Sequence, residues 1–387
     1  MTDLTRLELL RRAALGGAAL SIPGFLAACG GDDGETAGTT TGESAALAST
    51  LRFSNWQLYI DRDAKKKSPS LEQFTAKSGV KVNYVEDVND NATYFGKIQG
   101  PLSQGRGIDR DIIVMTDNSR FPGLLVSKKW VEPLDKERMP NISNLIDAQM
   151  SPPFDPDRTY SVPWLSGITG LATNVKASGG RIVTTMQQLL EDPKLKGKVT
   201  LLTEVADTMS PIMLENGDDP SKVTDESWNK AYDRIQKAVD AGQIRRFTGN
   251  DYVADLERGN IAAALSWSGD VATGLAANKA LRWNLPEQGS DIWTDNMFIP
   301  LDGSVPTASE YMNFYLDPKV AAMVAVGTGY ISPVKGVKDE AVKLDPESAN
   351  NPLIFPDDEI LSNVVQFDSA ALNNQTYIEQ WQQLLGA

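Results

Sequence analysis

An indole flanked by two acids marks the stretch DIWTDNMFIP, residues 291–300. At the two-residue period of a β-strand, Asp291, Trp293 and Asp295 lie on one face of the strand. A carboxylate in a cleft requires a cation or a hydrogen-bond donor, and an indole face attracts cations. We therefore expect a binding site for an amine here. The alternative is a sheet edge at which Trp293 fills the core and both acids are solvated.

Polar and aromatic side chains also follow other predicted strands. In an α/β sheet, ligands bind at the carboxyl ends of the strands, so these positions are candidates for the same site. Two alternatives stay open: the first aromatic pair could cover a helix end, and acids in a first helical turn could serve the helix dipole. The candidates are Trp56 and Tyr59, then Thr116, Asp117 and Asn118, then Glu204, Asp207 and Thr208, and Trp267.

The composition excludes several kinds of chemistry. The chain has no histidine, which removes the commonest general base and every imidazole metal site. Its single cysteine, Cys29, excludes an internal disulfide and a thiolate cluster. We expect no cofactor and no metal, and hydrolysis by a carboxylate pair is the enzymatic possibility that remains. The net charge of −14 argues against nucleic acid as a partner and permits a cationic ligand.

The first 50 residues indicate export followed by a tether. Arg11 and Arg12 precede an uncharged run over residues 13–28, which is short for a membrane span and suits the core of a signal peptide. The run ends in Leu-Ala-Ala-Cys, which resembles the lipobox of bacterial lipoproteins. We expect a signal peptide over 1–29, lipid attachment at Cys29 and a flexible tether over 30–50, rich in Gly, Thr and Ser. The sequence RRAAL leaves the route, Sec or twin-arginine, open.

Beyond the tether, strands and helices alternate, which favours a mostly parallel sheet covered by helices, and 387 residues suffice for two domains. The stretch at 159–174 is an exception, because two β-rich runs around Pro163, Gly167 and Gly170 follow each other without a helix. Such a pair is typical of a crossover between domains. The expected strands include 80–87, 111–117 and 198–204, and the expected helices include 68–79, stopped by Gly79, 92–105, and 224–242, stopped by Gly242.

Taken in order, these segments resemble the periplasmic binding proteins for spermidine and putrescine that serve ATP-driven transporters. The resemblance covers about residues 51–387. It implies an α/β fold of two lobes, the type II periplasmic-binding-protein fold, with a mixed, mostly parallel sheet and flanking helices in each lobe and crossover strands as hinge. The lobes would comprise 51–166 with 297–333 and 167–296 with 334–387. The segments are SNWQLYI, DIIVMTD, YSVPWLSGITGLATN, GKVTLLTEVADT, AALSWSGDV, DIWTDNMFIP, TGYISP and FPDDEILSNVVQFD.

The resemblance also assigns roles to residues. In that family, aromatic rings enclose the methylenes of a polyamine and acids hold its ammonium groups. Two segments depart from the pattern: Val205 replaces an acid, which leaves the second amine anchor open, and residues 116–118 replace a Ser and a Tyr. The matches are Trp56 and Tyr59 as first aromatic pair, Trp267 in the cleft, Trp293 and Asp295 as the amine-receiving Trp-x-Asp, Tyr330 as a hydroxyl-bearing ring, Gln366 (or Phe367) as the family's glutamine, and Glu204, Asp207 or Thr208 as second anchor.

We therefore expect an exported monomer, anchored by lipid to the outer face of the cell membrane, without enzymatic activity. It would close two lobes on a polyamine-like cation and deliver it to an ABC permease. Two alternatives remain open. The same fold could bind a sugar, an amino acid or a compatible solute, or the chain could be an exported glycosidase that uses two carboxylates from among Glu204, Asp207 and Asp295.

Overall fold

The computed structural model describes residues 45–386, except for the side chains of residues 273–277. The predicted signal peptide, Cys29 and most of the tether lie outside the described residues, so the predictions made for them stay predictions. Within residues 45–386, no helix combines the length and the apolar character that crossing a membrane requires.

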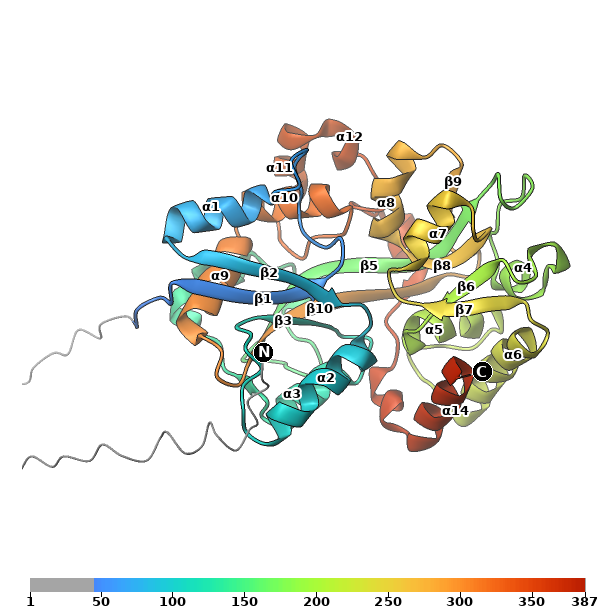
Figure 1. Ribbon diagram of the computed structural model, residues 1–387, viewed down its shortest axis with the longest axis horizontal. Coiled ribbons are helices and arrows are strands. Elements are labelled where there is room, and N and C mark those ends of the chain that lie inside the picture. Colours follow the sequence, from blue (N-terminus) through green and yellow to red (C-terminus); the bar gives the residue numbers. More distant parts are fainter. Residues whose placement is uncertain (1–44, 387) are drawn as a thin grey trace, which may run out of the picture. The chain divides into compact units, whose positions relative to one another are not determined.

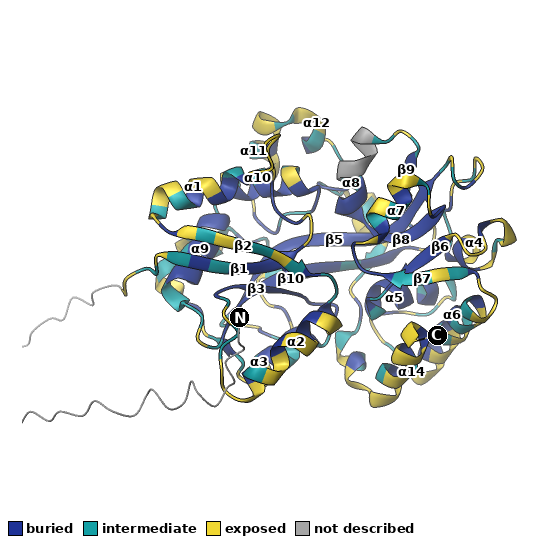
Figure 2. Ribbon diagram, in the orientation of Figure 1, coloured by how far each residue is buried: buried dark blue, intermediate teal, exposed yellow. Residues whose placement is uncertain are grey.

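Two long antiparallel strands, β5 (Ser161–Asn174) and β10 (Ser290–Pro300), lie at the centre of the structure (Figure 1). Almost every residue of both strands is buried (Figure 2). Further strands and helices lie on either side of β5 and β10. The side chains of both strands therefore contact other parts of the protein rather than solvent. Buried strands of this kind are apolar along most of their length, which makes the acids of β10 exceptional.

Each central strand has different partners along its length. Residues 295–298 of β10 pair with β3, whereas residues 169–173 of β5 pair with β8. Near β3, strand β1 runs parallel to β2, and Phe53 of β1 forms a parallel bridge to Ile112. Near β8, strand β6 runs parallel to both β7 and β8. The other strands are β1 (Thr50–Trp56), β2 (Lys81–Val88), β3 (Ile113–Thr116), β4 (Val131–Glu132), β6 (Val199–Leu202), β7 (Ile244–Thr248), β8 (Ala263–Trp267), β9 (Leu281–Asn284) and β11 (Val364–Val365).

The prediction of two separate runs around residues 159–174 was wrong, because β5 is one continuous strand of 14 residues. Pro163 pairs with Asn296 next to a register shift in β10, so the proline sits at an irregularity of the ladder. The two glycines are sites of close packing. A Cβ atom on Gly167 would lie 2.5 Å from the Trp293 ring, and one on Gly170 would lie 2.3 Å from the Trp283 ring.

The helices predicted over 68–79, 92–105 and 224–242 are confirmed. Helix α1 (Pro69–Ser78) begins at Ser68, whose hydroxyl accepts the amide N–H of Leu71 at 3.3 Å, and it ends at Gly79 in the left-handed region. Helix α6 (Asp225–Asp240) begins with a capping box formed by Thr224 and Ser227. Helices α2 (Asn91–Ser103) and α5 (Val205–Glu215) follow β2 and β6, as the alternating pattern requires.

The remaining helices flank the sheet, and most of them carry buried residues on one side and exposed residues on the other (Figure 2). Helix α11 packs against α10. These helices are α3 (Phe121–Ser127), α4 (Met186–Glu191), α7 (Tyr252–Arg258), α8 (Ser268–Ala277), α9 (Val305–Tyr315), α10 (Pro318–Thr328), α11 (Val337–Leu344), α12 (Pro346–Ala349), α13 (Asp358–Ser362) and α14 (Gln375–Gly386).

A buried guanidinium fixes the start of β5 against β10. Arg158 is 2% exposed, and its Nη1 donates to Ser161 Oγ at 2.9 Å and to Asn296 Oδ1 at 2.6 Å. Its Nε donates to the carbonyl oxygen of Gln149 at 2.8 Å. Burial lowers the pKa of Arg158 to about 10, so the side chain stays charged at neutral pH.

Replacing Arg158 tests whether this contact holds the two strands together. Arg158→Met leaves buried acceptors on Gln149 and Asn296 without donors, and each such loss costs about 1–3 kcal/mol. We expect the free energy of unfolding, measured by urea denaturation, to fall by at least about 3 kcal/mol. The matched control, Arg245→Met at an exposed position, should change it by no more than about 0.5 kcal/mol. Equal effects of the two substitutions would contradict the role of Arg158.

Candidate functional site

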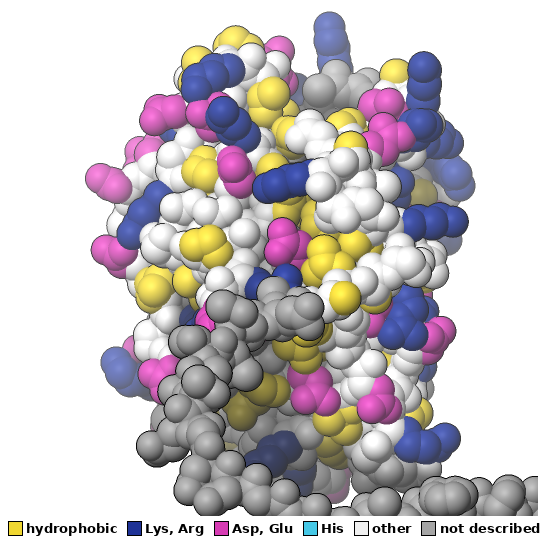
Figure 3. All heavy atoms as spheres, turned by 90° about the vertical axis from the view of Figure 1, so that its left-hand side faces the viewer, with side chains coloured by type: hydrophobic (Ala, Val, Ile, Leu, Met, Phe, Trp, Pro, Cys, Tyr) yellow, Lys and Arg dark blue, Asp and Glu magenta, His cyan; other side chains and the backbone are white. Residues whose placement is uncertain are grey.

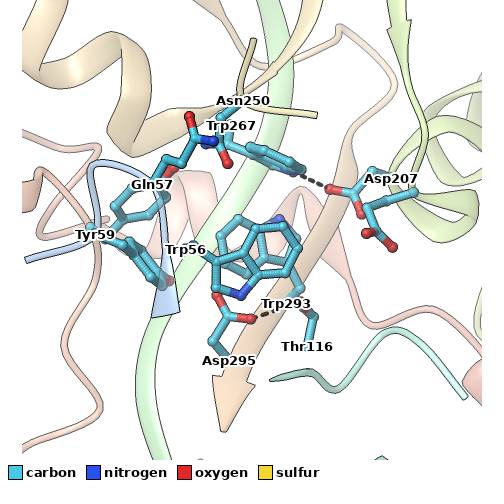
Figure 4. A pocket seen from close by; sticks show the side chains of 11 residues that line it. Trp56, Gln57, Tyr59, Thr116, Asp207, Asn250, Trp267, Trp293 and Asp295 are labelled. Carbon is cyan, nitrogen blue, oxygen red and sulfur yellow. Dashed lines mark hydrogen bonds between the residues drawn. The ribbon is translucent and has the colours of Figure 1, made fainter. Parts of the chain in front are cut away.

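A small cavity of about 20 Å³ lies beside the two central strands, where the partners of β10 and β5 change. Residues at the ends of β1 and β3 form one wall of the cavity, and residues at the ends of β6 and β8 form the opposite wall (Figure 4). Carboxyl ends of strands therefore converge here, as the strand-end argument predicts. Eleven residues line it: Trp56, Gln57, Tyr59, Thr116, Glu204, Asp207, Asn250, Trp267, Trp293, Asp295 and Tyr330.

Five aromatic rings form most of the wall, and each is at most 5% exposed. The rings meet edge to face: Trp267 lies 5.9 Å from Trp56 and 6.3 Å from Trp293, both at 78°. Tyr330 lies 5.8 Å from Trp293 and 4.8 Å from Tyr59. Edge-to-face contacts are a favourable arrangement for aromatic rings and hold these side chains in place. The walls suit an alkyl chain or a cation.

Asp295 stands at one end of this aromatic wall. It is 3% exposed and accepts a hydrogen bond from Thr116 Oγ1 at 2.7 Å. Burial raises the pKa of Asp295 to about 7, because a carboxylate loses its hydration there. The hydroxyl of Tyr59 lies near enough for the Asp295 charge to add to the effect of burial on the Tyr59 pKa, but it does not reach hydrogen-bond geometry.

Asp207 stands at the other end, and Trp56 and Trp293 lie between it and Asp295 in Figure 4. Its Oδ1 accepts from Thr169 Oγ1 at 2.5 Å and from Trp267 Nε1 at 2.7 Å. Burial raises the pKa of Asp207, and these donors oppose the rise. The position follows from the fold, because Asp207 lies in the first turn of α5, directly after β6.

A second carboxylate lies beside Asp207. The side-chain nitrogen of Asn118, Nδ2, donates to Asp207 Oδ2 and to Asp291 Oδ2, both at 3.0 Å. Asp291 is fully buried, and burial raises its pKa well above the usual value, with the charge of Asp207 adding to the rise. Its Oδ1 has no hydrogen-bond partner among residues 45–386.

Two further acids tie segments together around the cavity. Glu204 Oε1 accepts the amide N–H of Asn91 at 2.7 Å, at the first residue of α2, and burial raises its pKa to about 8. Asp117 accepts the amide N–H of Thr294 at 2.8 Å and Nε2 of Gln366 at 3.2 Å. Burial raises the pKa of Asp117 to about 7. Both acids therefore join parts of the chain that are distant in sequence.

Asp270 lies behind the cavity wall, in the first turn of α8. It accepts hydrogen bonds from Tyr330 Oη at 2.8 Å, Tyr252 Oη at 2.9 Å and Asn250 Nδ2 at 3.0 Å. Burial raises the pKa of Asp270 to about 6. A Cβ atom on Gly269 would lie 2.2 Å from the Tyr330 ring, so the small residue next to Asp270 lets this ring reach the cavity.

The structure brings most of the predicted site residues together. Four predicted residues lie outside the cavity lining: Asn118 bridges Asp207 and Asp291, Asp117 and Gln366 bond to each other, and Thr208 points away and donates to the carbonyl oxygen of Leu202 at 2.9 Å. The nine predicted residues that line the cavity are Trp56, Tyr59, Thr116, Glu204, Asp207, Trp267, Trp293, Asp295 and Tyr330.

Sequence reasoning missed two lining residues, Gln57 and Asn250. Asn250 follows the end of β7, so its position at a strand end was a signal from which the sequence could have identified it. Gln57 stands between the two aromatics already chosen, and a polar residue there has no distinguishing pattern. Asp291 was part of the opening motif but not of the predicted site, because nothing local shows that Asn118 would bring it beside Asp207.

The electrostatic character of the site follows from what these acids lack. Among residues 45–386, no ion pair with Lys or Arg involves Asp117, Glu204, Asp207, Asp291 or Asp295. On the molecular face in Figure 3, by contrast, acidic and basic side chains are interspersed. Buried carboxylates without a cation are costly. The site can therefore bind a cation, with aromatic faces for its apolar part.

In the described part of the chain, no three His, Cys, Asp or Glu residues are arranged to hold a metal ion. Further polar atoms at the cavity have no hydrogen-bond partner within residues 45–386. They are the donors Trp56 Nε1 and the Tyr59 hydroxyl, and the acceptor Asn250 Oδ1. Buried polar groups normally have hydrogen-bond partners. These atoms are consequently available to an organic ligand that carries both donors and an apolar chain.

Two long central strands with an aromatic and acidic cavity beside them suit a protein that holds a small solute. The chain belongs to the family of bacterial extracellular solute-binding proteins, whose profile matches residues 70–356.

Within that class, the chain is similar to the spermidine/putrescine-binding periplasmic protein of Escherichia coli, at 26% identity over 89% of this chain and 94% of that protein. It is also similar to the putrescine-binding periplasmic protein PotF of Escherichia coli, at 26% identity over 82% of this chain and 86% of that protein.

Among solved structures, a putative spermidine/putrescine ABC transporter from Listeria monocytogenes matches with a TM-score of 0.72 and 26% identity, over 87% of this chain and 98% of that one. These similarities confirm the resemblance found in the sequence and the two-lobed α/β fold.

The raised carboxyl pKa values predict how stability depends on pH. An unfolded Asp or Glu loses its proton near pH 4, whereas folded Asp117, Asp295 and Glu204 keep theirs to about pH 7, 7 and 8. Between these limits the folded state holds more protons, so the free energy of unfolding falls as pH rises, by up to about 1.4 kcal/mol per pH unit and carboxyl.

Urea denaturation of ligand-free protein at pH 5 and pH 8 measures this fall. We expect lower stability at pH 8. Asp295→Asn, which cannot ionise, should show a smaller fall than the unchanged protein. Stability that is equal at both pH values, or higher at pH 8, would contradict the assignment of raised pKa values.

Proposed function

We propose that this protein captures a polyamine, a cation of the spermidine or putrescine type, between its two lobes and delivers it to an ABC permease. The observation that carries the proposal is the set of buried carboxylates without a protein cation, placed around indole faces. An alkyl ammonium group supplies what such a cavity lacks: positive charge, N–H donors and apolar methylenes. The names of the similar E. coli proteins support the same ligand class.

The energies involved are sufficient for this function. An alkyl ammonium group has an unperturbed pKa near 10.4, so it is charged at neutral pH. A hydrogen bond to a charged group contributes about 1.5–3 kcal/mol and a cation–π contact about 0.5–2 kcal/mol. Three or four such contacts reach about −8 kcal/mol, or micromolar affinity, after the entropy of association is subtracted.

The two long strands suggest how the lobes would move. In this proposal, the chain crosses between the lobes at 166/167, at 296/297 and at 333/334. The register shift between Thr294 and Asn296, beside the second crossing, supplies an irregular point in the ladder at which the strands can bend. Hinges of this kind are a few residues that absorb backbone change.

Contacts across the proposed lobe boundary indicate a closed arrangement. Asn91 donates to Glu204, and Asn118 donates to Asp207, in each case from the first lobe to the second. The rings of Trp56 and Trp267 meet across the same boundary. These contacts would form as the lobes close, so capture of the ligand and closure are one event.

We propose binding without turnover. Asp207, Asp295 and Glu204 each already accept a hydrogen bond from a neutral donor of the protein. Carboxylates held by neutral donors can receive an ammonium group.

Calorimetric titration tests the proposal. We expect putrescine or spermidine to bind the purified protein, and glucose and glutamate to give no heat of binding. Asp295→Asn removes the charge that would meet an ammonium group, so it should weaken amine binding by about 10- to 100-fold, which corresponds to the 1.5–3 kcal/mol of one charge-assisted hydrogen bond.

The matched control is Asp317→Asn, which changes the acid that caps α10 at a distance from the cavity lining. It should leave the affinity for amines unchanged. If no amine produces heat with the unchanged protein, the proposed function is wrong. If amines bind equally well to Asp295→Asn, another acid receives the ammonium group.

We also propose that the protein is held at the outer face of the cell membrane by a lipid on Cys29, as an exported monomer. The lipobox-like Leu-Ala-Ala-Cys before a Gly-rich, Ser/Thr-rich stretch supports the anchor, and the family of extracellular solute-binding proteins supports export.

Fractionation of bacteria that express the full chain tests the anchor. We expect the unchanged protein in the membrane fraction and Cys29→Ser, which has no thiol to carry the lipid, outside it. Cys29→Ser should bind amines as the unchanged protein does. Recovery of both forms in the same fraction would contradict lipid attachment.

A further inference from the structure

We propose that Asn91 is a positioning residue for the acid that receives the ammonium group. Its side chain turns the hydroxyl proton of Thr116 toward Asp295 and so favours the charged form of Asp295. Asn91 is not among the residues that line the cavity, so it acts on a ligand only through Thr116. This inference rests on the proposed function, in which Asp295 binds one end of the amine.

The sheet places Thr116 beside Asp295 but does not fix the direction of the Thr116 hydroxyl proton. The two residues are partners in the antiparallel pairing of β3 with β10, and Thr116 Oγ1 lies 2.7 Å from Asp295 Oδ1. A hydroxyl group has one proton to donate and two lone pairs to accept with, and the proton rotates to suit its neighbours. The direction of this proton therefore depends on what else contacts Thr116.

The side chain of Asn91 contacts Thr116 at two points. Asn91 Oδ1 accepts the backbone N–H of Thr116 at 3.1 Å, and Asn91 Nδ2 donates to Thr116 Oγ1 at 2.9 Å. Because a backbone N–H can only donate, the Asn91 atom that faces it must be the oxygen, and the nitrogen then faces the hydroxyl. Thr116 Oγ1 accepts from Asn91, so its own proton is left for Asp295.

This order of donors favours a charged Asp295. A carboxylate accepts the Thr116 proton, whereas a protonated carboxyl that donated to Thr116 would leave the hydroxyl proton without an acceptor in this chain of contacts. Burial raises the pKa of Asp295 to about 7, and the hydrogen bond from Thr116 opposes the rise. The other titratable groups that act on the pKa of Asp295 are Tyr59, Asp117 and Asp207.

Helix capping does not account for the side chain of Asn91. An asparagine at the start of a helix commonly caps the free N–H groups there, but the cap of α2 is Asp90, whose Oδ1 accepts the N–H of Thr93 at 2.7 Å. The N–H of Asn91 itself donates to Glu204. Asn91 is fully buried, and its side chain is directed to β3 instead. The residue is thus held by its backbone on one side of the cavity wall and orients a hydroxyl on the other.

Putrescine binding at two pH values tests the inference. Calorimetry gives the dissociation constant at pH 6 and pH 9 for the unchanged protein, for Asn91→Ala, for Thr116→Val and for the double variant. An alkyl ammonium group, with a pKa near 10.4, is charged at both values, whereas Asp295 is largely protonated at pH 6 and charged at pH 9. The matched control is Asn174→Ala, which removes another buried asparagine with two hydrogen bonds to the backbone, outside the cavity lining.

We expect Asn91→Ala to bind putrescine about 10-fold more weakly than the unchanged protein at pH 6, and within about threefold of it at pH 9. Without Asn91 the Thr116 proton is no longer directed at Asp295, so the pKa of Asp295 rises and less of its charged form exists at pH 6. Thr116→Val should show the same pattern. The double variant should bind no more weakly than either single variant, because both substitutions interrupt one chain of hydrogen bonds. Asn174→Ala should match the unchanged protein at both pH values.

A second variant keeps the test open if Asn91→Ala does not fold. Asn91→Asp has the same size and still accepts the N–H of Thr116, but its carboxylate draws the hydroxyl proton away from Asp295. We expect it to lose at least about 10-fold in affinity at pH 6 and to keep its affinity at pH 9 within about threefold.

Three results would overturn the inference while leaving amine binding intact. They are an unchanged affinity of the Asn91 variants at pH 6, a loss that is equal at pH 6 and pH 9, and losses from Asn91→Ala and Thr116→Val that add in the double variant. An equal loss at both pH values would make the role of Asn91 purely structural. Absence of putrescine and spermidine binding by the unchanged protein at pH 9 would instead contradict the proposed function itself.

Discussion

Buried carboxyl groups without a protein cation are the constraint that the rest of this structure serves. Asp295, Asp207 and Asp291 are each at most 3% exposed, and burial raises the pKa of all three. A folded protein retains such groups only where neutral donors reduce the cost or where function requires them. The donors here are Thr116 at the end of β3, Asn118 just after it, Trp267 at the end of β8 and Thr169 within β5.

The packing of the central strands places these groups. Glycines at 167 and 269 let the rings of Trp293 and Tyr330 lie against the backbone, because a Cβ atom at either position would overlap a ring. Arg158 fixes the start of β5 against β10 through Asn296. Asn296 adjoins Asp295, so a structural cation supports the strand that carries the acid without pairing with the acid itself. The fold thus separates the cation that stabilises it from the carboxylates of the cavity.

The sequence predicted what local patterns determine. The predicted stop at Gly79 depends on residues a few positions apart and is confirmed, and the caps at Ser68 and Thr224 are equally local. The strand-end rule found six of the lining residues, because the carboxyl ends of these strands converge at the cavity. Trp293 and Asp295 came from the motif within β10, and Tyr330 came from the family resemblance. The continuity of β5 was missed, since Gly167 and Gly170 read as breaks in a strand and only the distant rings of Trp293 and Trp283 explain them.

The pairing of Asp291 with Asp207 was beyond local patterns for the same reason. It depends on Asn118, which follows β3, and three segments far apart in sequence must meet before the bridge exists. The same bridge joins the two lobes of the proposed arrangement, as Glu204 does through Asn91.

Closure therefore removes water from the acids while it adds only neutral donors to them, so it carries a cost in desolvation free energy. In the proposed function a neutral solute leaves that desolvation cost in place, whereas an ammonium group at each end removes it. The free energy of closing the lobes then depends on the charge of the guest, and selectivity for a diamine follows from the cost of closing without one.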